Sequence, residues 1–239
     1  MGRLVKFQVG NMFKQKFYYL CLGWLIFMGP VIDFLHTVCT NKYETMQVLP
    51  PIVTWLSRAI WIFDEIIFVT LFCCLDFSNE TTKNIIGRGY SRTQLLISKY
   101  IGSLVGIFSF IIILFVVIFG LFGINGLGYD SKTLYMLIIY IMKSIACTIF
   151  YSTMATVLEK KSLALIANLF VPSIFREALW FVCSKFNIDV RQCLMFNISF
   201  KFMNNLDLAN MIYAIMICSV HIIVFVVLGI SIIQRKEIK

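Results

Sequence analysis

The chain has few charged residues and few prolines. Charged side chains make up only 14% of its 239 residues, and Pro occurs four times. An average soluble domain has about 25% charged residues, so this chain would expose apolar surface that water-soluble proteins keep covered. What it has instead is 60% hydrophobic residues and a mean hydropathy of +0.87. We therefore exclude a water-soluble fold and expect one integral membrane domain over residues 1–239.

The chain also lacks the motifs of common catalytic and metal sites. It contains no GxxxxGK[ST] phosphate-binding loop, no HExxH and no GxSxG. Its two histidines, His36 and His221, are too few for a His-rich metal site. The adjacent acids Asp64 and Glu65 are reminiscent of intramembrane metalloproteases, but those enzymes also need histidines that this chain lacks. The sequence therefore predicts a protein that is not an enzyme and holds no cofactor or metal of its own.

Six apolar segments are long enough to cross a bilayer, which takes about 20 mostly apolar residues. The third is uncharged and carries Gly102 and Gly106 in a GxxxG spacing, which lets helices approach closely. We expect an all-α fold with six transmembrane helices. The segments run from Phe17 to about Leu35, from about Trp55 to Leu75, from Tyr100 to Tyr129, from Leu134 to Leu158, from Ser162 to about Cys183, and from Leu208 to Ile233.

Basic residues exceed acidic ones and give a formal net charge of +9. In a membrane protein we interpret this excess as loop charge that orients the helices, in preference to a nucleic-acid surface. It places both termini in the cytoplasm, with Asp76 to Lys99 as the largest cytoplasmic loop and Ser184 to Asp207 as the largest outer segment. The loops on the N-terminal side hold 13 Lys and Arg (Arg3, Lys6, Lys14, Lys16, Lys83, Arg88, Arg92, Lys99, Lys160, Lys161, Arg235, Lys236 and Lys239), and the others hold six (Lys42, Arg58, Lys132, Lys185, Arg191 and Lys201).

The N-terminal segment, Met1 to Lys16, has a moderate amphipathic pattern. Four of its apolar residues fall on one side of a helix, and the segment contains no acid. This pattern favours a helix that lies along the membrane surface before the first span. The alternative is a frayed basic tail. The four residues are Val5, Val9, Met12 and Phe13.

The segment from Ser78 to Tyr100 is the most informative part of the chain. Ser78 or Asn79 is a suitable cap for a short helix that runs through Ile86, and a turn from Gly87 to Tyr90 follows. Ser91 and Gln94 have the spacing of a capping box that begins the next helix. We expect a small helix on the cytoplasmic face, fixed to two spans and able to transmit movement to a partner. An ordinary basic loop is the alternative.

This segment resembles the permease subunits of type-2 ABC exporters, and is most similar to the permeases of lantibiotic-immunity and bacitracin-resistance transporters. The resemblance in layout covers the whole chain, and the detailed match covers about Asn79 to Tyr100. The matching residues, in order, are Glu80, Thr81, Lys83, Asn84, Ile85, Ile86, Gly89, Ser91, Arg92, Ser98 and Lys99.

The resemblance implies a partner that hydrolyses ATP. In such permeases the short helix is a coupling helix received by an ATPase subunit, here expected in two copies that carry the ATP and Mg. A second permease copy or a related chain would complete the pathway in a bacterial cell membrane. The outer segment from Trp180 to Asp207 would form a re-entrant helical hairpin, and the cargo would be an amphiphilic antimicrobial peptide. The implied coupling residues are Glu80, Thr81, Lys83, Asn84, Ile85, Arg88, Ser91 and Arg92.

Five charged residues lie in or near the predicted spans: Asp64, Glu65, Lys143, Arg176 and Glu177. An unpaired charge at the bilayer centre costs about 2.5–3.5 kcal/mol on insertion scales. Lys143 lies about 15 Å inside the fourth span at 1.5 Å per residue. We therefore expect Lys143 to face the bundle interior and meet Asp64 or Glu65. The alternative is that these residues line the path of a cationic peptide substrate.

Two other classes of protein remain open. A secondary transporter or channel would move its substrate without ATP, but it is expected to show repeated or Gly/Pro-broken spans, and only the fifth span has a proline, Pro172. A structural anchor would not need charges within the bilayer. The spacing of Cys183 and Cys193 leaves it open whether they form a disulfide.

Overall fold

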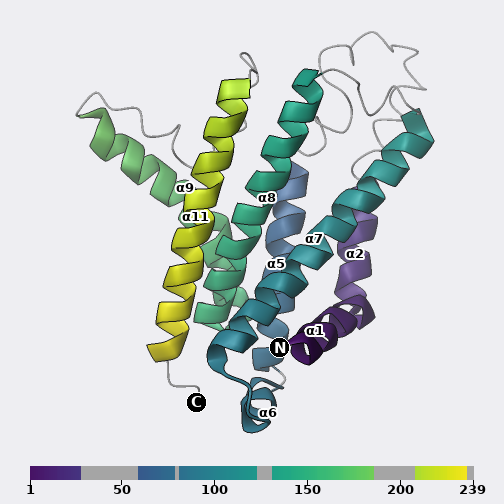
Figure 1. The fold of residues 1–239 in the computed structure, drawn as a ribbon, viewed down its shortest axis with the longest axis vertical. Coiled ribbons are helices and arrows are strands. Elements are labelled where there is room, and N and C mark those ends of the chain that lie inside the picture. The colour runs from purple at the N-terminus through teal and green to yellow at the C-terminus, as the bar shows by residue number, and fades with distance from the viewer. Residues whose placement is uncertain (28–58, 79–80, 123–130, 186–207, 236–239) are drawn as a thin grey trace.

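The computed structural model describes residues 1–27, 59–78, 81–122, 131–185 and 208–235. All regular secondary structure within these ranges is helical (Figure 1). The described helices are α1 (Gly2–Lys14), α2 (Lys16–Ile26), α5 (Ala59–Ser78), α6 (Thr81–Gly87), α7 (Arg92–Phe122), α8 (Ser131–Leu158), α9 (Lys161–Ser184) and α11 (Leu208–Arg235).

Three of the described helices are long and apolar enough to cross a membrane, which makes the chain a membrane protein. They are Arg92–Leu121 within α7, Lys132–Leu158 within α8, and Leu208–Arg235, which is α11. The sequence predicted six spans. The other three expected spans correspond to α2, α5 and α9. The continuation of α2 to residue 35 lies outside the described residues, and α5 contains three acids. Within α9, Lys161–Phe175 is a shorter apolar helix.

Helix α8 lies at the centre of the bundle and packs against α5, α7, α9 and α11 (Figure 1). Within its most apolar stretch 61% of the residues are buried, against 11% in α11. Small side chains such as Ala146 and Ala155 are fully buried on α8, and they allow its neighbours to approach. Helix α11, in contrast, exposes a long apolar face whose natural environment is lipid.

Helices α5 and α7 meet where two phenylalanine rings lie against two glycines. A Cβ atom on Gly102 would lie 2.8 Å from Cζ of Phe72, and one on Gly106 would overlap the Phe68 ring and approach Sδ of Met12 to 2.9 Å. The Phe68 and Phe72 rings are stacked, with centroids 6.1 Å apart. The two glycines of the GxxxG spacing therefore let α5 and α7 come close together, because the aromatic rings of α5 occupy the space that side chains would fill.

The predicted N-terminal helix is present as α1, and it packs against α7. Its buried residues are Leu4, Gln8 and Met12, while Phe13 of the predicted apolar face is exposed. Its position along the membrane surface stays a prediction. An extended backbone at Gln15 separates α1 from α2.

The short helix α6 lies beyond the ends of α5 and α7, at the end of the bundle that also holds α1 and the last turn of α11 (Figure 1). The capping box is confirmed: Gln94 N donates to Ser91 Oγ at 3.2 Å, and Ser91 N donates to Gln94 Oε1 at 3.0 Å. Gly89 allows the intervening turn because its φ is +87°. The predicted helix and turn are therefore present, with the helix ending at Gly87.

Helix α9 has two unlike halves on either side of Pro172. Its first half buries Ala164 and Asn168 against the bundle, while the second half projects outward and exposes Ile174 and Phe175 (Figure 1). Most of the predicted re-entrant hairpin, Trp180 to Asp207, lies outside the described residues. So do the side chain of Cys183 and the whole of Cys193, whose pairing the sequence left open.

Candidate functional site

A group of buried polar side chains joins α5, α8 and α9 inside the bundle, and we call it the polar cluster. Its members are exposed by 7% or less. Polar groups so deeply buried in a membrane bundle are usually hydrogen-bonded to one another or to the backbone. The cluster consists of Asp64, Glu65 and Thr70 from α5, Lys143 and Thr148 from α8, and Asn168 from α9.

Glu65 receives both a hydrogen bond and a positive charge from α8. Thr148 Oγ1 donates to Glu65 Oε1 at 2.8 Å. Lys143 lies close enough for its charge to act on Glu65, and its Nζ is 6.0 Å from the centroid of the Tyr140 ring. Glu65 and Lys143 thus lie within electrostatic range of each other across the α5–α8 interface. Attraction between opposite charges offsets part of the free energy of burying each of them.

Asp64 points toward a different neighbour from that of Glu65, because adjacent residues of a helix lie about 100° apart. Cys21 of α2 is close enough to interact with Asp64 electrostatically. Asp64 is 4% exposed, and no donor among the described residues forms a hydrogen bond with its Oδ2. Asp64 is therefore the acid of the cluster with unused capacity to bind a proton or a cation.

Asn168 ties the third helix into the cluster. Its Nδ2 donates to Thr70 Oγ1 at 2.8 Å and to the Tyr151 carbonyl at 3.3 Å, so one amide connects α9 with α5 and α8. Sequence reasoning missed Asn168 and Thr70. The signal was available, because an amide within an apolar segment is a frequent interhelical contact in membranes.

One of the five predicted intramembrane charges, Glu177, does not belong to this cluster in the structure. It is exposed on the outward-projecting half of α9. The side chain of Arg176 lies outside the described residues. Lys99, which the sequence placed at the end of a cytoplasmic loop, is fully buried instead, and its Nζ donates to the Cys73 carbonyl at 2.5 Å. This placement was wrong because α7 begins at Arg92, so Lys99 already lies two turns inside it.

The predicted coupling residues divide into an exposed set and a buried one. Lys83, Asn84 and Arg88 are exposed on and just after α6, and Ser91 is exposed as the cap of α7. Ile85 points inward and packs with Leu4 of α1 and Leu95 of α7. Arg92 is half-buried. Glu80 and the side chain of Thr81 lie outside the described residues.

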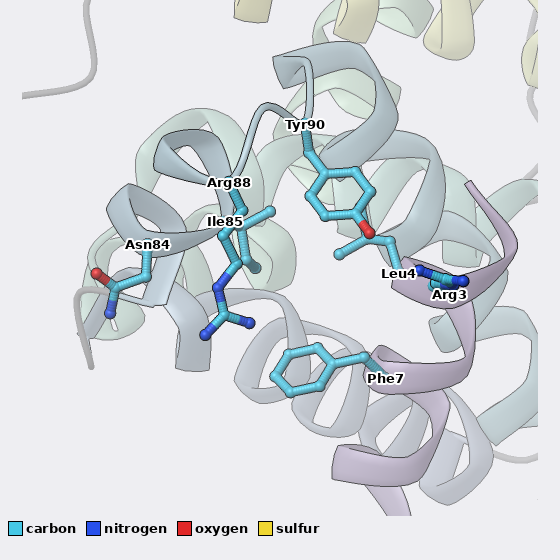
Figure 2. Close-up of a pocket in the computed structure, with 7 residues that line it drawn as sticks. All are labelled: Arg3, Leu4, Phe7, Asn84, Ile85, Arg88 and Tyr90. Carbon is cyan, nitrogen blue, oxygen red and sulfur yellow. The ribbon is translucent and has the colours of Figure 1, made fainter.

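A pocket of about 310 Å³ separates α6 from α1, and we call it the α1–α6 pocket. Figure 2 shows Arg88 reaching from the end of α6 toward Phe7 of α1, with Arg3 and Tyr90 on the far side. None of the lining residues is acidic. The pocket is lined by Arg3, Leu4, Phe7, Asn84, Ile85, Arg88 and Tyr90.

One family model matches residues 17–239, and its description is a protein of unknown function, DUF2705. The chain belongs to the DUF2705 family. The match covers α2 to α11, and therefore includes both α6 and the polar cluster of this DUF2705 protein. Comparison with curated proteins and with solved structures gave no match.

Proposed function

We propose that this DUF2705 chain is the membrane-spanning permease subunit of an ATP-driven exporter. The observation that carries the proposal is α6. It is a short helix between the long helices α5 and α7, it lies beyond their ends, and it exposes Lys83, Asn84 and Arg88. In this proposal the chain has six spans and α6 lies in the cytoplasm with both termini.

The packing of α6 suits the transmission of force. Ile85 anchors it to α1 and α7 through Leu4 and Leu95. The capping box fixes the start of α7, and Gly89 sets a tight turn between the two helices. Because packed helices move as rigid bodies, a push on α6 would be passed to α7 directly.

The energy for transport must come from another polypeptide, because the sequence has no phosphate-binding loop. We propose two copies of an ATPase subunit, which carry ATP and Mg, docked on α6 of each permease. The second permease is a copy of this chain or a related one. The exposed apolar face of α11 and of the second half of α9 offers surface for that chain as well as for lipid.

The proposed cargo is an amphiphilic antimicrobial peptide, expelled for self-protection at a bacterial cell membrane. Cationic peptides would be attracted by carboxylates along the pathway. Glu177 is exposed on α9, and Asp64 has an oxygen that no described donor satisfies, whereas Glu65 is engaged with Thr148 and Lys143. We therefore assign Glu65 and Lys143 to the stability of the bundle, and Asp64 and Glu177 to the substrate.

The alternative is an ATP-independent secondary transporter or channel, and the buried Asp64 is the observation that favours it. Carriers driven by proton or ion gradients use buried acids of this kind. An experiment with vesicles that contain the purified chain alone distinguishes the two functions. Under an imposed ion gradient, a secondary transporter would move peptide in these vesicles, whereas an ATP-driven permease without its ATPase would not.

Charge reversal on α6 tests the proposal. Lys83→Glu changes an exposed residue outside the α1–α6 pocket, so the fold should be retained, whereas the ATPase rate of the assembled complex should lose most of its stimulation by peptide. The matched control is Lys132→Glu, an exposed lysine at the opposite end of the bundle, at the start of α8 (Figure 1). Equal ATPase rates in the two variants would contradict a coupling role for α6.

A further inference from the structure

We propose that the α1–α6 pocket binds the headgroup of an anionic phospholipid. The proposal goes beyond the permease function and does not depend on it, since it concerns how the chain meets the membrane surface. It rests on the charge of the pocket, on its mixed lining and on the faces that α1 exposes.

The charge of the pocket is positive on both walls. Arg3 comes from α1 and Arg88 from the end of α6, and the pocket between them has a volume of about 310 Å³. The α1 wall has no nearby acid along the chain, because residues 1–32 contain no Asp or Glu. The acid closest in sequence to the α6 wall is Glu80, which comes before the helix and does not line the pocket. Two guanidinium groups that face one small space attract an anion, and the planar guanidinium matches a phosphate with two parallel hydrogen bonds.

The lining also has an apolar part, which a free inorganic anion would not use. Phe7 lies below Arg88, Leu4 lies beside Arg3, Ile85 lies beside Arg88, and Tyr90 lies at the opposite side of the pocket from Phe7 (Figure 2). A phospholipid presents both features at once, because its phosphate is joined to a glycerol and acyl chains. The volume lies at the lower end of the range of small-molecule sites, about 300–1,000 Å³, which suits a headgroup with its chains outside.

Helix α1 exposes the residues of a helix at the membrane surface. Phe7 and Phe13 are 44% and 38% exposed, and Lys6 and Lys14 are exposed beside them. Exposed aromatic rings enter the headgroup region while lysines remain with the lipid phosphates. The basic residues on this side predict a cytoplasmic location, where the leaflet is rich in anionic lipids and basic pockets bind their headgroups. A bound headgroup would connect α1 to α6, and so fix α6 relative to the membrane surface.

Lipid retention by the purified full-length chain tests this proposal. The protein is exchanged into nanodiscs of phosphatidylcholine with a minor fraction of phosphatidylglycerol, and lipid that stays bound after detergent extraction is counted by native mass spectrometry. The test variant is Arg3→Gln/Arg88→Gln. The control is Lys83→Gln/Lys160→Gln, which removes the same charge at exposed positions outside the pocket.

We expect the wild-type chain and the control to retain phosphatidylglycerol over phosphatidylcholine. The pocket variant should bind it about tenfold more weakly or worse, since each charge-assisted hydrogen bond contributes about a factor of ten. The variant Arg88→Lys, which keeps the charge but loses the two-pronged geometry, should fall between the two. Circular dichroism should show an unchanged helix content in every variant.

Three results would overturn the proposal. Equal losses in the pocket and control variants would mean that the attraction is diffuse. Competition by millimolar inorganic phosphate as strong as that by the lipid would mean that the site takes a free anion. Loss of ATPase binding in the pocket variant, with lipid retention unchanged, would mean that the pocket takes an acidic side chain of the partner instead.

Discussion

The polar cluster and the α1–α6 end of the molecule use polar residues in opposite ways. In the cluster, Glu65 and Asn168 are bonded to groups from other helices, and their side chains are buried. At the α1–α6 end the anchor is apolar, through Ile85, and the cations Arg3, Lys83 and Arg88 are exposed. The difference shows that buried polar groups connect the helices of the bundle, whereas the charged groups of the α1–α6 end are exposed and available for recognition.

Removal of Lys143 should have the largest effect on stability. Lys143→Met leaves the Glu65 carboxylate buried without the Lys143 charge, and an uncompensated buried charge costs up to about 3–5 kcal/mol. We expect a clearly lower thermal unfolding temperature in detergent, and partial recovery when Glu65→Gln is added. The control is Lys132→Met, an exposed lysine on the same helix. If the double variant is no more stable than Lys143→Met alone, the two residues do not act as a pair.

Overfilling the contact between α5 and α7 should have the next largest effect. Gly106→Ala places a methyl group against the Phe68 ring and Met12, and overpacking of this kind costs about 1–3 kcal/mol. Gly120→Ala on the same helix meets no atom within 4 Å, and should be neutral or slightly stabilising. Unfolding temperatures of the two variants compare them directly. A Gly106→Ala protein as stable as Gly120→Ala would show that the helices are less closely packed than described.

Loss of the capping box should have a smaller effect on stability, because it removes one exposed hydrogen bond at the α1–α6 end. Ser91→Ala removes the hydrogen bond to Gln94 N, and loss of a helix cap costs about 1 kcal/mol. Ser91→Asp keeps an acceptor at that position and should restore most of this stability. Hydrogen exchange at the first turn of α7 is the measurement. Exchange that is equally fast in both variants would exclude the cap as the cause.

The smallest effect on stability is expected for Lys83→Glu. Surface substitutions away from packed groups stay within about 0.5 kcal/mol. The unfolding temperature should therefore not change, even though the same substitution is expected to impair ATPase coupling. A large drop in stability would show that the exposed face of α6 also supports the fold, and the contrast between the two regions would then fail.

The sequence predicted local features better than it predicted which residues would meet. The helix at α6, its turn and the Ser91–Gln94 box follow from caps and glycines within a few residues, and all are present. The buried face of α1 and the burial of Lys99 depend on where α7 lies, which no local pattern contains.

The polar cluster illustrates the same limit. The cost of a buried charge indicated that Lys143 needed a partner, but it did not select between Asp64 and Glu65. That selection depends on which side of α5 faces α8. The bond from Thr148 to Glu65 and the bond from Asn168 to Thr70 join residues 83 and 98 positions apart, so they arise only when the helices have assembled.

The most direct test of the permease proposal is a cross-link from α6 to the partner. Single cysteines are introduced at Lys83 on α6 and at Lys132 at the other end of the bundle, in a chain without other reactive cysteines, and complexes purified from membranes are treated with a short bifunctional reagent. The proposal predicts a cross-link between position 83 and a polypeptide that carries a phosphate-binding loop, and no such product at position 132. A transport-competent preparation without an ATPase, or one whose ATPase cross-links at position 132 but not at 83, would contradict it.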